Sequence, residues 1–231
     1  MENKQIGQLN EHSLHLSLKR YLEPDTVCHE RAVGEYVVDI LNDGGITEIE
    51  TRSFSNMAKK LPLLLREPWS VTVVYPILQT KWILEVDGES GTVNKKRRSP
   101  KKGRPSDVIS ELYKLRAYLT HPQFTLKLLF LEVEEYKKKG SRTRWGKGIS
   151  PGRERVPVAI LGERTYHTRD DYATLIELPS APFTAKELSE RNGLKGRASW
   201  YALQLLLALG VITQSGTRGK AFLYAPTDLH P

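Results

Sequence analysis

The sequence predicts an α/β protein: a mixed β-sheet flanked by helices, followed by a smaller unit of short helices and a hairpin. Short apolar runs typical of strands recur along the first 136 residues, and segments with apolar residues at three- and four-residue steps separate them. The pattern of predicted elements changes after residues 137–157, a segment that is rich in lysine, arginine and glycine. We therefore predict a main unit over 1–136, a basic loop or linker over 137–157, and a second unit over 158–231.

The main unit opens with a helix at about 10–21, which should end before Pro24. Two runs that are rich in β-branched residues follow, YVVDI at 36–40 and ITEIET at 46–51. The turn residues Asn-Asp-Gly-Gly at 42–45 separate them, which predicts a hairpin.

Helical spacing resumes from about 53 to 65, where Pro62 should kink the helix or end its first part. The continuous apolar run 71–75 is typical of a strand that is buried on both faces. The alternating run 81–87 indicates a second, less buried strand, and we expect the basic segment 95–104 to be a loop.

A helix over about 106–119 and a strand over 125–133 complete the predicted mixed sheet. Beyond the basic segment, 156–161 has the pattern of one more strand and 170–176 that of a short helix.

The second unit carries strong local signals. Thr184 with Glu187 forms a capping box at the start of a short helix, and Asn192-Gly193 supplies a left-handed turn after it. A second helix over about 196–209 should stop at Gly210.

Two short strands then flank a basic hairpin tip. The runs 211–212 and 221–224 lie on either side of the Gly-Thr-Arg-Gly-Lys segment 216–220. Helix, turn, helix and hairpin in this order predict a winged helix-turn-helix, which often binds DNA through its second helix and its wing. Some winged helices serve only to dock proteins, and the pattern leaves both uses open.

Composition limits the class of protein. Hydrophobic residues make up 39% and charged residues 27% of the 231 positions, as in a globular protein. No apolar stretch is long enough to span a membrane, and the polar N-terminus lacks the apolar segment of a secretory signal. The single cysteine, Cys28, excludes an internal disulfide framework and a cysteine-rich zinc site. We expect a cytoplasmic protein without a membrane partner.

The net charge of +8 is concentrated in clusters. Segment 95–104 holds seven basic residues and no acid, and segment 137–155 holds eight against one acid. Clustered cations neutralise phosphates and release counterions, which favours nucleic acid as a partner, although solvated basic loops are the alternative. We expect DNA rather than RNA. The candidate nucleic-acid contacts are Lys95, Lys96, Arg97, Arg98, Lys101, Lys102, Arg104, Arg142, Arg144, Trp145, Lys195, Arg197, Arg218 and Lys220.

Carboxylates stand at positions where a charge is costly. Glu11 lies on the apolar side of the first helix, and Asp39 interrupts the apolar run 36–40. Glu48 and Glu50 are two residues apart and share one face of the next strand. If the two strands pair, Asp39 and Glu48 become neighbours. Clustered carboxylates bind Mg²⁺ or Mn²⁺, because these hard cations take oxygen ligands.

Residues 7–60 resemble the PD-(D/E)xK nuclease superfamily, the fold of restriction endonucleases. The resemblance rests on GQLNEHSLHLSLKRYL, which is similar to the first helix, and on VGEYVVDILNDGGITEIET, which is similar to the two strands. It implies that Glu11, Asp39 and Glu48 hold the metal, with the Ile49 carbonyl as a further ligand.

The chain departs from this pattern at the lysine, because position 50 is Glu50. Some members of the superfamily carry Glu-x-Glu there, and others take the lysine from the next helix. Lys60, with Lys59 as the alternative, is the candidate for orienting the attacking water. The catalytic candidates are therefore Glu11, Asp39, Glu48, Glu50 and Lys60.

Two functions follow. The first is a Mg²⁺-dependent DNA endonuclease that hydrolyses phosphodiester bonds. The second is a DNA-binding protein with an inactive nuclease fold, or a winged-helix transcriptional regulator. A homodimer or a protein partner remains compatible with both. The whole chain also resembles an uncharacterised bacterial family with EIxT and SPKKG segments, a resemblance that implies no activity.

Overall fold

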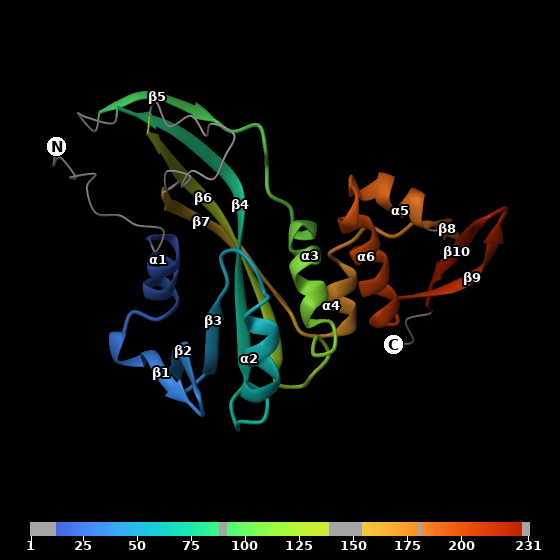
Figure 1. The fold of residues 1–231 in the computed structure, drawn as a ribbon, viewed down its shortest axis with the longest axis horizontal. Coiled ribbons are helices and arrows are strands. Elements are labelled where there is room, and N and C mark those ends of the chain that lie inside the picture. The colour runs from blue at the N-terminus through green and yellow to red at the C-terminus, as the bar shows by residue number, and fades with distance from the viewer. Residues whose placement is uncertain (1–12, 88–91, 139–153, 180–181, 228–231) are drawn as a thin grey trace, which may run out of the picture.

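The computed structural model describes residues 13–87, 92–138, 154–179 and 182–227. It has the predicted α/β architecture, a large mixed sheet flanked by helices (Figure 1). Seven strands form this sheet in the order β1-β2-β3-β4-β6-β7, with β5 paired to β4, and three further strands form a second sheet near the C-terminus. None of the helices in the described part of the chain has the length and apolar character needed to cross a bilayer.

The predicted helix and hairpin are present at one side of the large sheet. The elements are α1 (Ser13–Leu22), β1 (His29–Val33), β2 (Tyr36–Asn42) and β3 (Gly45–Ile49). The strands β2 and β3 are antiparallel, with Ile40 opposite Thr47 and Asn42 opposite Gly45, as the hairpin signal predicts. Strand β1 was not predicted from the sequence; it pairs antiparallel with β2 and is mostly exposed.

Gly45, the first residue of β3, has a backbone conformation that favours glycine and lies too close to Ser70 for a side chain to fit. Its φ is +104°, and a Cβ built on it would lie 2.4 Å from the Ser70 Oγ and 2.6 Å from the Ser70 carbonyl oxygen. The Ile46 N–H donates to the same carbonyl at 2.8 Å. This close approach starts the parallel pairing of β3 with β4.

The helix α2 (Met57–Leu64) connects β3 to β4 and continues through Pro62. The sequence had led us to expect a kink or an end there. In the structure the helix ends only at Leu65, whose N–H bonds the Leu61 carbonyl. Met57, Leu61 and Leu64 bury one face of α2 on the sheet, and this packing compensates for the backbone hydrogen bond that proline cannot make.

Two expectations about the next segment were wrong. The predicted strands at 71–75 and 81–87 are one strand, β4 (Val71–Val86), which passes through Pro76. Proline is tolerated because β3 pairs with β4 only as far as Val74, and β5 (Val93–Arg98) begins to pair with it at Trp82. Pro76 lies on the edge between them, where no ladder bond is lost. Part of the expected basic loop is therefore strand β5.

The centre of the sheet is the parallel pair formed by β4 and β6 (Phe124–Lys138), and β7 (Glu154–Tyr166) pairs antiparallel with β6. Residues 154–157, which we had placed in the basic linker, and 158–166, placed in the second unit, thus belong to the large sheet. Apolar positions of β7 are interrupted by Pro157 and Gly162, and two register shifts accompany its pairing with β6. The local pattern was therefore too short to reveal a 13-residue strand.

The helix expected at 106–119 is instead three short pieces, η2 (Pro105–Val108), α3 (Ile109–Leu112) and η3 (Tyr113–Leu115). The short helix α4 (Arg169–Ala173) follows β7.

The C-terminal part contains β8 (Phe183–Thr184), α5 (Ala185–Asn192), α6 (Arg197–Ala208), β9 (Ile212–Arg218) and β10 (Ala221–Pro226). The predicted capping box is present, because the Thr184 hydroxyl accepts the Glu187 N–H and the Glu187 carboxylate accepts the Thr184 N–H. Gly193 has the predicted left-handed φ of +62°. The strands form an antiparallel sheet in the order β8-β10-β9.

Two apolar clusters cover the two faces of the large sheet. The smaller packs α1 against the sheet through Leu14 and Leu18. The larger continues from α2 and α3 into α6, so that Leu112 and Leu206 belong to one core. Tyr113 packs between the two units, with its ring 4.8 Å from that of Tyr201. This continuity fixes α6 against α3, on the side of α3 that faces away from the large sheet (Figure 1).

Candidate functional site

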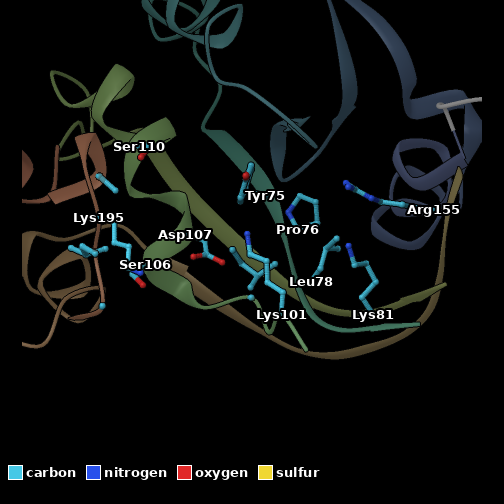
Figure 2. A pocket seen from close by; sticks show the side chains of 15 residues that line it. Tyr75, Pro76, Leu78, Lys81, Lys101, Ser106, Asp107, Ser110, Arg155 and Lys195 are labelled. Carbon is cyan, nitrogen blue, oxygen red and sulfur yellow. The ribbon is translucent and has the colours of Figure 1, made fainter. Parts of the chain in front are cut away.

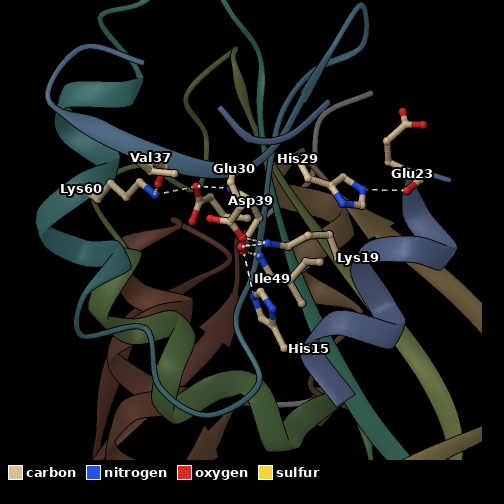
Figure 3. Close-up of polar contacts among 10 residues, drawn as sticks. His15, Lys19, Glu23, His29, Glu30, Val37, Asp39, Ile49 and Lys60 are labelled. Atoms are coloured by element: carbon tan, nitrogen blue, oxygen red, sulfur yellow. Dashed lines mark hydrogen bonds and ion pairs between the residues drawn. The ribbon is translucent and has the colours of Figure 1, made fainter. Parts of the chain in front are cut away.

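The predicted carboxylates Asp39 and Glu48 lie together between α1 and α2, where β2 and β3 run side by side. Because Ile40 pairs with Thr47, Asp39 lies opposite Glu48, one step further along the hairpin. The Glu48 Oε1 is 3.4 Å from the Asp39 backbone nitrogen. Both side chains are largely buried, with 16% of the Asp39 side chain and 9% of the Glu48 side chain exposed. Figure 3 shows this cluster and its contacts.

Asp39 is held as an anion by donors from α1 and β3. Its Oδ2 accepts the Ile49 N–H at 2.8 Å and a hydrogen bond from the His15 Nε2 at 3.0 Å, and its Oδ1 is 2.9 Å from the Lys19 Nζ. Burial alone would raise the pKa of Asp39, but these hydrogen bonds outweigh it and lower the pKa to about 2. Asp39 is therefore fully charged at neutral pH.

Glu48 has one close cationic partner. The Lys60 Nζ, which comes from α2, donates to the Glu48 Oε1 and to the Val37 carbonyl oxygen, each at 2.6 Å. Burial raises the pKa of Glu48 above 4.5, and the contact with Lys60 only partly opposes this effect. Lys60 thus ties α2 to both strands of the hairpin.

Glu50 stands just beyond β3, where its N–H donates to the Val74 carbonyl at 2.9 Å. Burial and the charges of Glu48 and Asp39 raise the pKa of Glu50 to about 7. A carboxyl group with such a pKa exchanges a proton easily at neutral pH, which is the property required of a general acid or base.

The buried lysine of the cluster, Lys19, was not predicted from the sequence. Lys19 is 3% exposed, and its Nζ contacts both Asp39 and Glu30. Burial alone would lower the pKa of Lys19, but the bonds to the two carboxylates raise it above 10.5. The available signal was its spacing, because Lys19 is four residues after His15 and so lies on the same side of α1. Glu11 lies outside the described residues.

The donor set is compatible with a hard cation, although the described residues form no ready ligand group. No cluster of three or more His, Cys, Asp or Glu side chains with the arrangement of a metal site occurs within the described ranges. Asp39 and Glu48 nevertheless offer oxygen ligands. Burial is the main cause of the raised pKa of Glu50, the charges of Glu48 and Asp39 add to it, and the charge of Lys60 partly opposes it.

The candidate nucleic-acid contacts are distributed over several elements. Lys95, Lys96, Arg97 and Arg98 lie on the exposed strand β5. The Lys96 Nζ is 2.8 Å from Glu134 and lies over the Trp82 ring, 5.2 Å from its centroid.

The other candidates lie at the C-terminal unit or next to it. Lys101, Lys102 and Arg104 precede η2, and Lys195 and Arg197 lie at the start of α6. At the β9–β10 hairpin Lys220 is exposed, while Arg218 forms an ion pair with Glu187 at 2.8 Å. Arg142, Arg144 and Trp145 fall outside the described residues.

Comparisons with known proteins give a family and one relative. The family profile described as "Domain of unknown function (DUF8091)" matches residues 12–167, a range that includes α1 to β7. A protein of Treponema pallidum (strain Nichols), described as an uncharacterized protein, is 29% identical over 224 residues, which cover 95% of this chain and 86% of that protein. No solved structure matches the chain significantly.

Proposed function

We propose a function for this chain, which belongs to the DUF8091 family: it is a metal-dependent phosphodiesterase that cuts DNA. In this proposal the main unit is a PD-(D/E)xK nuclease of the restriction-endonuclease-like fold, and the C-terminal unit is a winged helix. The observation that carries the proposal is the meeting of Asp39, Glu48 and Lys60 from three elements.

The arrangement of these residues supports the resemblance. Asp39 lies on one strand of the hairpin and Glu48 on the next, and α1 packs beside them through His15 and Lys19. The missing lysine has a structural substitute, because Lys60 reaches Glu48 from the helix that follows the strand. This contact supports the variant of the pattern in which the next helix provides the lysine.

A divalent cation, Mg²⁺ or Mn²⁺, would be held by Asp39 and Glu48, with the Ile49 carbonyl as a further oxygen donor. Such a cation supplies an activated water and stabilises charge on a phosphate. Lys60 keeps the Glu48 carboxylate oriented towards Asp39 and adds a positive charge beside the reacting phosphate. Glu50, with its pKa near 7, is suited to accept or return a proton.

The C-terminal unit supports a role in gripping DNA. It has helix α5, a turn, helix α6 and the β9–β10 hairpin in the order that a winged helix requires. Lys195 and Arg197 mark the start of the second helix, and Lys220 lies at the hairpin tip. In the proposal these cations contact phosphates and position the DNA, while the main unit cuts it.

The test is cleavage of plasmid, linear and branched DNA by the full chain in the presence of Mg²⁺ or Mn²⁺. We expect cutting to fall by at least about 100-fold in Asp39→Asn and Glu48→Gln, because each change removes a ligand charge. The matched control is Asp43→Asn, since Asp43 is an exposed acid in the β2–β3 turn. Cutting that survives in both site variants contradicts the proposal.

A second function, DNA binding without cleavage, is favoured by two contacts of Asp39. The Lys19 Nζ and His15 Nε2 already occupy both oxygens of Asp39 at about 3 Å, and a cation must compete with them. This function predicts binding that weakens steeply with salt and no metal-dependent cutting of any of the three DNA forms.

A further inference from the structure

A cavity with a volume of about 480 Å³ lies between the large sheet and the C-terminal unit, and Asp39, Glu48 and Glu50 are not among the residues that line it. Its walls come from β4, the start of β7, η2 and α3, and the turn between α5 and α6 (Figure 2). This volume lies in the range of small-molecule sites. Gly103 closes part of the wall: its N–H bonds the Leu78 carbonyl at 2.8 Å, and a Cβ there would lie 2.7 Å from that oxygen.

One side of the cavity carries cations that a buried acid holds in place. Lys81 and Arg155 both line it, and each has a nitrogen 3.2 Å from the Glu135 Oε2. Glu135 is fully buried. These two cations are thus partly neutralised and firmly positioned, which suits them to orient a ligand rather than to attract it.

At the cavity mouth the charge is not neutralised. Lys101 and Lys195 are exposed lining residues, and neither has an ion-pair partner in the described part of the chain. The acid that lines the cavity, Asp107, caps the start of η2, because its Oδ2 accepts the Arg104 N–H at 3.1 Å. The mouth therefore favours an anion.

The remaining wall is apolar and has one aromatic ring. Ile77, Leu78 and Leu194 contribute aliphatic surface. Tyr75 also lines the cavity, and the edge-on contact of its ring with Phe54, at 5.3 Å between centroids, fixes its orientation. A fixed aromatic ring beside aliphatic groups can stack against a planar base.

We propose that this cavity binds a nucleoside monophosphate group, with the phosphate at Lys101 and Lys195 and the base against Tyr75. The group is either a free mononucleotide or the phosphorylated terminal nucleotide of a strand, since both present the same chemistry. The assignment goes beyond the proposed nuclease and does not depend on cleavage.

The test is isothermal titration of the full chain, without divalent metal, at about 50 mM salt, where phosphate contacts are least screened. The ligands are deoxyadenosine monophosphate, deoxyadenosine and inorganic phosphate. We expect the monophosphate to bind more tightly than either of its parts. Lys101→Gln and Lys195→Gln should each weaken its binding by about fivefold, as expected for a partly solvated charge contact.

The matched control is Lys186→Gln, which removes the same charge from an exposed site on α5 outside the cavity and should leave binding unchanged. A pair of oligodeoxynucleotides with and without a 5′-phosphate distinguishes the two sources. A preference for the phosphorylated strand that Lys101→Gln abolishes identifies the terminal nucleotide, and binding of the mononucleotide without that preference identifies the free ligand.

Three results would overturn the assignment. The first is no binding of the monophosphate at millimolar concentration, and the second is equal binding of deoxyadenosine or inorganic phosphate. The third is an equal loss of affinity in Lys186→Gln and in the two cavity variants. None of them bears on metal-dependent cutting, so the nuclease proposal and this one fail separately.

Discussion

Replacing Lys60 with methionine tests whether this lysine compensates the buried charge of Glu48. The change keeps much of the side-chain volume and removes the ammonium group that lies 2.6 Å from the Glu48 Oε1 and from the Val37 carbonyl oxygen. Only 15% of the Lys60 side chain and 9% of the Glu48 side chain are exposed, so water cannot readily replace the lost partner. The variant must accommodate a buried carboxylate without its cation.

The expected loss in the free energy of unfolding is about 3 kcal/mol at pH 8, the usual cost of removing one member of a buried ion pair. Burial already raises the pKa of Glu48, and without Lys60 that pKa must rise further. A group whose pKa is higher in the folded protein contributes stability below its unfolded pKa and loses it as the pH rises through the folded pKa. The deficit of Lys60→Met should therefore be small near pH 4.5 and largest at pH 8.

The assay is urea unfolding of the wild type and Lys60→Met at pH 5 and pH 8. The control is the double variant Lys60→Met/Glu48→Gln, in which neither member of this ion pair carries a charge, and its deficit should be at most about 1 kcal/mol at both pH values. A deficit that does not change with pH, or that the second substitution does not relieve, refutes the assignment of the cost to an unpaired Glu48.

Three other substitutions test the fold. Gly45→Ala should destabilise the protein by about 2–4 kcal/mol, because its Cβ would lie 2.4 Å from the Ser70 Oγ at a φ of +104°. In thermal unfolding, the melting temperature of this variant should be well below that of the control Gly44→Ala. Burial alone would raise the pKa of Glu135, but its cationic partners lower it. Ionised Glu135 therefore stabilises the protein above pH 4.5, and this contribution disappears as the pH falls further. In urea unfolding, wild type and Glu135→Gln should differ by about 1–3 kcal/mol at neutral pH, and this difference should vanish in acid. Thr184→Ala removes the N-cap of α5 and should cost about 1 kcal/mol, and a serine at this position should restore most of it.

Local signals were sufficient where a structure depends on neighbours in the sequence. The hairpin of β2 and β3 was predicted because a turn separates two β-branched runs, and its register follows from that turn. The same pairing allowed Asp39 and Glu48 to be predicted as neighbours. The capping box of α5 and the left-handed Gly193 are likewise properties of a few adjacent residues.

Features that depend on distant partners were missed. Pro76 suggests a break when it is considered alone, and only the absence of a neighbouring strand at that point of the edge permits a continuous β4. β7 carries an irregular apolar pattern, and its pairing with β6 defines it. Lys19 was not among the predicted site residues, because its partners Asp39 and Glu30 come from other segments of the chain.

The central strand pair of the sheet can form only late in synthesis of the chain. β4 (Val71–Val86) is an apolar strand whose parallel partner is β6 (Phe124–Lys138). That partner leaves the ribosome roughly fifty residues later, a delay of about 3–10 s at 5–20 residues per second. During this interval the nascent chain can pair β4 with β3 and β5 along one edge, but the edge that β6 will occupy stays open to chaperones and to other nascent chains.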